Sequence, residues 1–344
     1  MPLLEVRDLT IEFLNGGKYT QAVSGVSFHL EEGELLALVG ESGCGKSISC
    51  LSLARLLPCP PGKISKGQIL LQCKNDGGTV DVLQLKESEL RKIRGREISY
   101  IFQEPGMSLN PVFRIGDQIA ESLKLHRPEI ADRKAEAIAL LKHVGIPDAE
   151  NRINRYPHEL SGGMQQRVMI AMALASDPSI LIADEPTTAL DVTIQAQILD
   201  LIAELQKERK MSVILVTHNL GIVAQLADRV AVMYAGQIVE TAPVEELLYH
   251  PAHPYTKSLI AAIPVLNSSD ERLQTIRGMV PAPENFSNGC RFYDRCDYAT
   301  SLPESDQLIC KERNPELKDT GNKHLCACHF CNCTDCKESG GKPC

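Results

Sequence analysis

The spacing of hydrophobic residues predicts strands in the N-terminal third of the chain, where apolar and polar positions alternate. One helix is expected among these strands, from Lys46 to just before Pro58, because proline has no amide hydrogen to continue a helix. The strands are expected over residues 3–14, 22–40 (two strands joined by a turn around Gly33), 66–73, 79–85 and 97–105.

From about residue 107 to 175 apolar residues recur every three or four positions, which is typical of helices. Beyond this block, short apolar runs alternate with helical segments. The runs cover residues 179–184, 212–218 and a hairpin at 229–240 around Gly236, and the helices cover 193–210, 220–227 and 254–264. We therefore predict an α/β fold with a mixed sheet: a largely parallel core, an antiparallel N-terminal portion and an inserted helical subdomain.

The periodicity fades after residue 264, which indicates a boundary near 265. Residues 1–264 are expected to form the main domain. Residues 265–344 are rich in Pro, Asn, Asp and Cys, and their pattern is too irregular to predict a hydrophobic core of their own. We call this second segment the C-terminal extension.

Composition excludes some classes of function. Apolar residues make up 43% of the 344 residues, aromatic residues only 4%, and tryptophan is absent, so an aliphatic core is expected. The net charge of −8 argues against general nucleic-acid binding, which needs a basic surface. No apolar run approaches the roughly eighteen residues that a membrane span needs. Glu5 and Asp8 interrupt what would be the apolar part of a signal peptide, so a cytosolic chain is expected.

The sequence GESGCGKS, residues 40–47, matches the phosphate-binding loop G-x-x-x-x-G-K-[ST] and lies between an apolar strand and a predicted helix, as that loop requires. Glycines let such a loop curl so that its amides and the following helix start surround an anion. Lys46 is expected to reach the β- and γ-phosphates of a nucleotide, and the Ser47 hydroxyl to bind Mg²⁺. A glycine-rich turn that only connects strand to helix is the alternative. The predicted binding residues are Gly40, Ser42, Gly43, Cys44, Gly45, Lys46 and Ser47, with Cys44 interpreted as a small filler rather than a redox switch.

Residues 179–186, SILIADEP, place Asp184 and Glu185 at the C-terminal end of an apolar strand, where ligands bind in parallel sheets. Asp184 is expected to hold Mg²⁺ through water. Glu185 is expected to act as a general base that orients the water attacking the γ-phosphate. A helix N-cap with an acidic first turn would explain one of these carboxylates but not both. Together with the phosphate loop, the pair predicts a nucleotidase.

The segment LSGGMQQR, residues 160–167, resembles the LSGGQ signature of ABC-type ATPases, with Met164 in the last position. The resemblance extends over roughly residues 3–262. It implies further site residues: Gln103 as the Q-loop glutamine that contacts Mg²⁺ and senses the γ-phosphate, Asp191 in the D-loop, His218 as the switch histidine, and Phe13 as the aromatic residue stacked on adenine, with Tyr19 as the less favoured substitute.

The signature residues Ser161, Gly162 and Gly163 precede a predicted helix, so their amides form a second anion-binding end. In the ABC family two such domains pair head to tail, and each signature covers the ATP held by the partner's phosphate loop. The resemblance therefore implies a dimer with two ATP molecules at its interface. ATP binding favours the closed dimer and hydrolysis favours the open one, which is a population shift.

Two classes of ABC protein are weighed, a transporter subunit and a soluble protein of DNA repair or translation. The block between Gln103 and Leu160 is too short for the coiled coil of a repair protein. Translation factors usually carry two nucleotide domains in one chain, whereas this chain shows the motifs of one. A transporter subunit is therefore favoured. The segments FQEPGMSLNP, HPAHPYTKSLIAAIP and PAPENFSNGCRFYDRC resemble the ATP-binding subunits of oligopeptide, dipeptide and nickel importers.

This resemblance implies several partners and a location. The partners are two membrane permease subunits, a second ATPase subunit that is identical or related, and an extracytoplasmic solute-binding protein that acts indirectly. The expected location is the cytoplasmic face of the cell membrane, as a peripheral subunit. The cargo stays open among peptides, nickel and metallophores, because an ATPase subunit does not contact it.

Nine of the thirteen cysteines lie at or after Cys290, and in a reducing compartment such a cluster indicates metal rather than disulfides. The importer subunits that the chain resembles bind a [4Fe–4S] cluster in this extension. The matching positions are Cys290, Cys296, Cys310 and Cys328, with Cys326 as the competitor for the fourth.

Two alternatives stay open for these cysteines. The spacing of Cys328 with Cys331 and of Cys333 with Cys336 is typical of structural zinc, although only one residue separates the two pairs. Free thiols are the other alternative. Cys331, Cys333, Cys336 and Cys344 are surplus to the cluster and are interpreted simply as a thiol-rich end.

Overall fold

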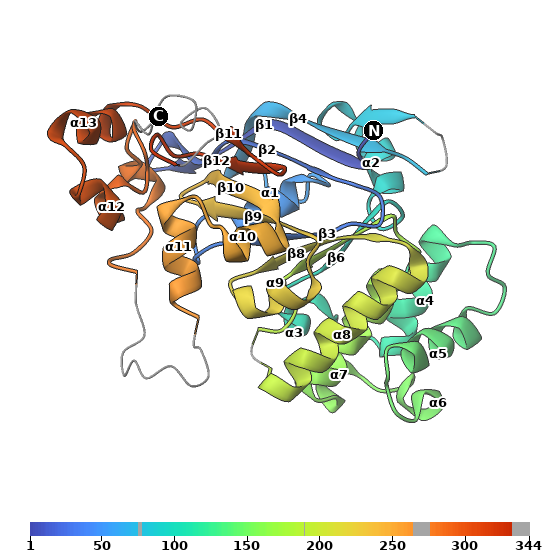
Figure 1. Ribbon diagram of the computed structural model, residues 1–344. Coiled ribbons are helices and arrows are strands. Elements are labelled where there is room, and N and C mark those ends of the chain that lie inside the picture. Colours follow the sequence, from blue (N-terminus) through green and yellow to red (C-terminus); the bar gives the residue numbers. More distant parts are fainter. Residues whose placement is uncertain (75–77, 189, 264–275, 332–344) are drawn as a thin grey trace. The chain divides into compact units, whose positions relative to one another are not determined.

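The computed structural model describes residues 1–344 except 75–77, 189, 264–275 and 332–344, which are drawn in grey in Figure 1. The chain forms two compact units. The first unit comprises Met1–Leu4, Leu30–Glu34 and Leu70–Val216, and the second comprises Glu5–His29, Leu35–Ile69 and Thr217–Cys344.

The first unit contains a parallel sheet. β7 (Ile180–Asp184) lies between β6 (Ile98–Ile101) and β8 (Ser212–Thr217), and Asp184 is opposite Val216. The apolar residues of β7 are completely buried, as the run SILIAD predicts for a strand covered on both faces. This burial places the last residue of β7, Asp184, at the edge of a rigid core.

The helical block lies in the same unit, where α4 (Ile115–His126), α5 (Arg133–His143) and α7 (Gly162–Ala175) pack on one another, as Figure 1 shows in green. Their periodic apolar residues are buried, which confirms the helices predicted there. Among the described residues, no helix is long and apolar enough to cross a bilayer. The helices of this unit are α2 (Glu87–Ile93), α3 (Pro105–Ser108), α4 (Ile115–His126), α5 (Arg133–His143), α6 (Ala149–Arg152), α7 (Gly162–Ala175) and α8 (Val192–Arg209).

The second unit is built on the hairpin of β9 (Arg229–Tyr234) and β10 (Gln237–Pro243), which turns at Gly236 as predicted. β3 (Leu35–Val39) runs parallel to β9. On the other side of the hairpin, β12 (His324–Cys326) pairs antiparallel with β10, and β11 (Lys318–Gly321) pairs with β12. A second sheet has the order β2-β1-β4. Its strands are β1 (Leu4–Asn15), β2 (Lys18–Leu30) and β4 (Gly62–Gln72).

The helices of the second unit are short. Those of the main domain are α1 (Lys46–Ser52), α9 (Leu220–Leu226), α10 (Val244–Tyr249) and α11 (Pro254–Ala261), and those of the C-terminal extension are α12 (Asp297–Thr300) and α13 (Glu304–Glu312). The strands β11 and β12 of the extension were not expected. They are too short for a periodic pattern, and β12 exists because β10 offers it an edge to pair with.

Several predicted boundaries were wrong. The helix α1 ends at Ser52, well before Pro58, because the chain turns there and Arg55 takes a left-handed conformation (φ 51°) that no helix can include. β6 ends at Ile101, and Pro105 begins α3 instead of ending a strand. Proline suits the first turn of a helix, where its missing amide hydrogen is not needed. The predicted strand 79–85 is shortened to β5 (Thr79–Asp81), followed by a 3₁₀ turn.

A buried pair of polar side chains attaches β12 to β10. The Nε2 atom of His324 lies 2.6 Å from Oε1 of Glu240, and the two side chains are 3% and 0% exposed. Glu240 also accepts hydrogen bonds from the backbone amides of Ala252 (2.6 Å) and His253 (3.1 Å). Burial alone would raise the pKa of Glu240, but the hydrogen bonds from His324 and Ala252 outweigh it and lower this pKa. The folded unit therefore favours the ionised carboxylate.

Replacing His324 with alanine should destabilise the second unit by about 3 kcal/mol, because the Glu240 carboxylate would stay buried without its partner. Urea unfolding followed by circular dichroism measures this change. Lys66→Ala is the matched control, since Lys66 and its partner Asp8 are exposed (71% and 65%). Equal effects of the two substitutions would contradict the structural role of the buried pair.

His253 makes the stability of the folded chain depend on pH. Its ring is 1% exposed, its Nδ1 accepts the amide hydrogen of Tyr255 (3.0 Å), and burial lowers its pKa to about 4. Between about pH 6.5 and pH 4 the unfolded chain therefore takes up a proton that the folded chain does not. The free energy of unfolding should fall by up to about 1.4 kcal/mol per pH unit as pH decreases through this window. His253→Asn, which retains a helix-capping acceptor, should show a flatter profile in urea unfolding above pH 4.5.

Candidate functional site

The predicted phosphate loop connects β3 to α1 in the second unit, and its conformation requires glycine. Gly40, Gly43 and Gly45 have φ angles of 150°, 80° and 103°. A Cβ atom on Gly40 would lie 2.1 Å from the carbonyl oxygen of Met233, so no other residue fits there. The glycines of the motif are therefore required by backbone geometry and by the close approach of β9.

Lys46 lies folded into this loop. Its ammonium donates hydrogen bonds to the carbonyl oxygens of Gly40 (2.8 Å) and Glu41 (3.0 Å), and the residue is 5% exposed. Cys44 is fully buried beside it, and burial raises the pKa of its thiol. An inaccessible, protonated thiol supports the interpretation of Cys44 as a filler. Ser42 is exposed, and Ser47 is half-buried at the start of α1.

The other predicted nucleotide contacts of the second unit lie on strands or directly after them. Phe13 is half-buried on β1. Its substitute Tyr19 lies on β2, is 50% exposed, and has the ammonium of Lys63 at 5.3 Å from its ring centroid. His218 is exposed and follows β8 directly, as the pattern predicted.

In the first unit, Gln103 and Glu185 are brought together. The Nε2 of Gln103 lies 3.3 Å from Oε2 of Glu185, and the hydroxyl of Thr188 donates to the same oxygen at 3.0 Å. Glu185 has a positive φ of 44°, and its amide donates to the carbonyl of Val216 (2.9 Å). Asp184 precedes it at the end of β7, half-buried. The sequence analysis missed Thr188, although it stands only three residues after Glu185.

The signature residues lie at the N-terminus of α7 in the same unit. Ser161 caps the helix, since its hydroxyl accepts the amide hydrogen of Met164 (3.4 Å), and Gly162 and Gly163 form the first turn. Asp191 caps α8 in the same way and accepts from the amide of Ile194 (3.0 Å). Each of these side chains satisfies amide groups that a helix start leaves without partners.

The four predicted cluster ligands, Cys290, Cys296, Cys310 and Cys328, line one small pocket of the second unit. The amide of Cys290 also donates to the carbonyl of Cys310 at 2.8 Å. Burial, reinforced by neighbouring thiols, raises the pKa of Cys290 to about 12 and that of Cys328 to about 12. Within the residues that the structure describes, no group of three or more Cys, His, Asp or Glu side chains could hold a single metal ion.

Cys326, the competitor for the fourth position, does not line this pocket. It is buried on β12 and packs against Cys331. A hydrogen bond from Cys326 lowers the pKa of Cys331 to about 7. No cysteine in the described part of the chain forms a disulfide bond. Cys333, Cys336 and Cys344, which belong to the zinc alternative and the thiol-rich end, lie outside that part.

Comparison with known proteins identifies the family. The profile described as "ABC transporter" matches residues 23–188, and that of the oligopeptide/dipeptide transporter C-terminal region matches residues 239–302. The oligopeptide transport ATP-binding protein OppD of Bacillus subtilis is 52% identical over 302 residues, which cover 87% of this chain and 83% of OppD. The chain belongs to the family of ABC transporter ATP-binding proteins.

Further relatives agree with this family. A putative peptide import ATP-binding protein of Brucella ovis is 48% identical over 334 residues, 95% of this chain and 96% of its own. Among solved structures, the dimeric ATP-binding cassette MJ0796 bound to ADP and Pi is 27% identical with a TM-score of 0.61, over 70% of this chain and 98% of that one. This ABC ATPase therefore has the P-loop ABC fold with mixed α/β sheets, and it hydrolyses ATP.

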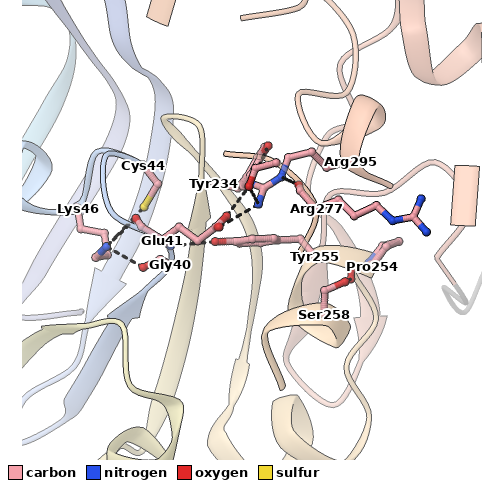
Figure 2. A network of polar contacts seen from close by, with 11 residues as sticks. Gly40, Glu41, Cys44, Lys46, Tyr234, Pro254, Tyr255, Ser258, Arg277 and Arg295 are labelled. Carbon is pink, nitrogen blue, oxygen red and sulfur yellow. Dashed lines mark hydrogen bonds and ion pairs between the residues drawn. The ribbon is translucent and has the colours of Figure 1, made fainter. Parts of the chain in front are cut away.

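One contact of the ATPase loop was not anticipated from the sequence. Glu41 forms an ion pair with Arg295, a residue of the C-terminal extension, as Figure 2 shows. Burial alone would lower the pKa of Arg295, but its contact with Glu41 outweighs burial and raises this pKa, so the guanidinium is charged at all ordinary pH values. The motif GCRFYDRC contains Arg295, but nothing in the sequence indicates its partner.

Proposed function

We propose that this ATPase is the ATP-hydrolysing subunit of a membrane ABC importer for peptides or a related small cargo. The observation that carries the proposal is the identity of 52% and 48% with two proteins named for peptide transport, over most of their length. The match to the C-terminal region of oligopeptide/dipeptide transporters supports the same cargo class. None of these relatives favours a soluble role in translation or DNA repair.

We assign the catalytic roles as follows. The loop 40–47, with the ammonium of Lys46, binds the phosphates of ATP. Mg²⁺ would offset the phosphate charge, and Ser47, Gln103 and Asp184 would hold it. Glu185 accepts the proton of the water that attacks the γ-phosphate. The hydrogen bonds from Gln103 and Thr188 to one oxygen of Glu185 support this role, because they orient the carboxylate.

Other residues complete the proposed site. His218 contacts the γ-phosphate and keeps the attacking water in position, and Phe13 stacks on adenine. Ser161, Gly162, Gly163 and Asp191 act on the ATP held by the partner in a head-to-tail dimer. The dimeric state of MJ0796 supports this part of the proposal.

Glu185→Gln should lower ATP turnover by roughly 10²- to 10⁴-fold, because an amide cannot accept the proton. ATP binding should be retained, since the amide preserves the shape of the side chain and a hydrogen-bonding oxygen. Steady-state phosphate release and binding of a fluorescent ATP analogue measure the two quantities. Glu204→Gln on the exposed face of α8 is the matched control and should hydrolyse ATP at the normal rate. Near-normal hydrolysis by Glu185→Gln would rule out the general-base role.

We further infer the assembly. Two permease subunits and a second ATPase subunit, identical or related, complete the importer, and a solute-binding protein delivers the cargo outside the membrane. The ATPase would be peripheral at the cytoplasmic face. Within the chain, residues 1–264 with a helical subdomain at about 107–175 form the motor, and residues 265–344 form the extension.

We propose that Cys290, Cys296, Cys310 and Cys328 bind a [4Fe–4S] cluster. Their shared pocket supports this ligand set, and the burial of Cys326 against Cys331 supports Cys328 as the fourth member. The residues fit the group chemically, because four thiols, one of them on α13, line one pocket. Since burial raises the pKa of Cys290 and Cys328, iron would have to supply the positive charge that deprotonates them. The cluster would then cross-link a segment that has little core.

The full chain purified without oxygen should be brown and contain about four irons per chain. The double variant Cys290→Ser, Cys296→Ser should lose the iron and the absorbance. Cys59→Ser, at an exposed cysteine, is the matched control and should retain both, as should Cys326→Ser. A colourless protein with one zinc per chain would refute the cluster.

A further inference from the structure

Arg295 of the C-terminal extension contacts the phosphate loop (Figure 2). Its Nη1 lies 2.7 Å from Oε2 of Glu41, and its Nη2 lies 2.9 Å from Oε1 of the same carboxylate. Glu41 is the second residue of the loop 40–47. A guanidinium that binds both oxygens of a carboxylate forms the strongest and most directional kind of ion pair.

The guanidinium of Arg295 has no donor left over. Besides Glu41, its Nε donates to the carbonyl oxygen of Arg277 (2.6 Å), Nη2 to that of Gly278 (3.3 Å) and Nη1 to the hydroxyl of Tyr234 (3.4 Å). These contacts account for all five N–H groups of an arginine. The side chain is 8% exposed, against 28% for Glu41. Arg295 is therefore held in one place, and Glu41 is held with it.

Glu41 transmits this contact to the rest of the loop. Its backbone amide donates to the hydroxyl of Tyr255 on α11 (2.9 Å), and its carbonyl oxygen accepts from the ammonium of Lys46 (3.0 Å). One residue thus connects the extension, α11 and the lysine that the phosphate loop uses. A change in the position of Glu41 would displace the partner of Lys46.

A second arginine of the extension, Arg291, contacts the phosphate loop indirectly, through the β9–β10 turn. Arg291 donates to the carbonyl oxygen of Ala235 in the β9–β10 turn. The next residue of that turn, Gly236, donates its amide hydrogen to the carbonyl of Cys44 (2.9 Å). The segment between Arg291 and Arg295 therefore holds the loop at two points, directly at Glu41 and, through the turn, at Cys44.

The charge of Glu41 explains why this contact matters for nucleotide binding. A carboxylate in a loop that binds triphosphate repels the ligand unless a cation neutralises it. Arg295 supplies that cation at hydrogen-bonding distance, and its low exposure limits screening by solvent.

We propose that Arg295 is a positioning residue for nucleotide binding: it neutralises and holds Glu41, so the folded extension sets the affinity of the phosphate loop for ATP. The proposal rests on the assignment of residues 40–47 as the nucleotide site. Because coupling is reciprocal, ATP binding in turn stabilises the extension around Arg295.

The test is a double-mutant cycle in the full chain, with the affinity for a fluorescent ATP analogue as the measurement. Arg295→Gln leaves the Glu41 carboxylate without its cation, and affinity should fall about tenfold. Glu41→Gln removes the repelling charge and should not weaken binding. The combined variant, Glu41→Gln with Arg295→Gln, should return to within about threefold of the natural chain. A merely structural role of Arg295 predicts instead that the combined variant binds no better than Arg295→Gln.

Two further variants separate the possible failures. Arg277→Gln removes an arginine of the same extension whose side chain is 82% exposed, and it should bind the analogue normally. Lys46→Ala should lose binding; if it does not, the assignment of the nucleotide site is wrong. If Lys46→Ala loses binding but Arg295→Gln does not, the role of Arg295 is refuted.

Amide hydrogen exchange provides a readout independent of affinity. In the natural chain, ATP should slow exchange in the segment around Arg295, and in the combined variant this protection should be lost. If Arg295→Gln fails to fold, Glu41→Gln still decides the question, because a tenfold loss of affinity in that variant would overturn the proposal.

Discussion

The second unit depends on the close approach of two backbones, the phosphate loop and the β9–β10 hairpin. Gly40 lies so near the carbonyl of Met233 that a Cβ atom would overlap it. Gly236 of the hairpin is equally close to β2, since a Cβ atom there would lie 2.2 Å from the carbonyl of Ala22. The amide of Gly236 then reaches the carbonyl of Cys44. Because these contacts are between main-chain atoms, no side chain can change its rotamer to relieve them. The shape of the loop is therefore set by the hairpin as much as by its own sequence.

The same hairpin supports the C-terminal extension, which explains how a segment with little core of its own is ordered. β12 extends the sheet from β10, and the buried pair of Glu240 and His324 attaches it there. Aromatic rings are scarce in this chain, yet Tyr234, Tyr255 and Phe292 meet at centroid distances of 4.7 to 5.3 Å. Tyr234 comes from β9, Tyr255 from α11 and Phe292 from the extension. The extension thus contributes to the core of the second unit. The phosphate loop contacts the same aromatic residues, because the amide of Glu41 donates to the hydroxyl of Tyr255.

The first unit solves a different problem, the placement of carboxylates at the end of a buried strand. The four apolar residues of β7 are buried, and Asp184 and Glu185 follow them where the core ends. Glu185 takes a left-handed conformation that is unfavourable for a side chain of its kind, and the hydrogen bond from its amide to the carbonyl oxygen of Val216 keeps it there. Gln103 and Thr188 then fix one carboxylate oxygen. Backbone strain therefore occurs at Glu185, the residue proposed as the general base.

By itself, the sequence determined most strands and helices of the main domain, the phosphate loop and the pair of carboxylates, because these depend on local periodicity and on short motifs. It also placed Cys290, Cys296, Cys310 and Cys328 in one candidate set, through family resemblance. Only the tertiary structure decided which side chains far apart in the chain meet. Glu41 and Arg295 are separated by 254 positions, and Glu240 and His324 by 84. Such pairs leave no periodic signal, because their contact depends on how strands and turns pack in three dimensions, and not on the residues that flank them.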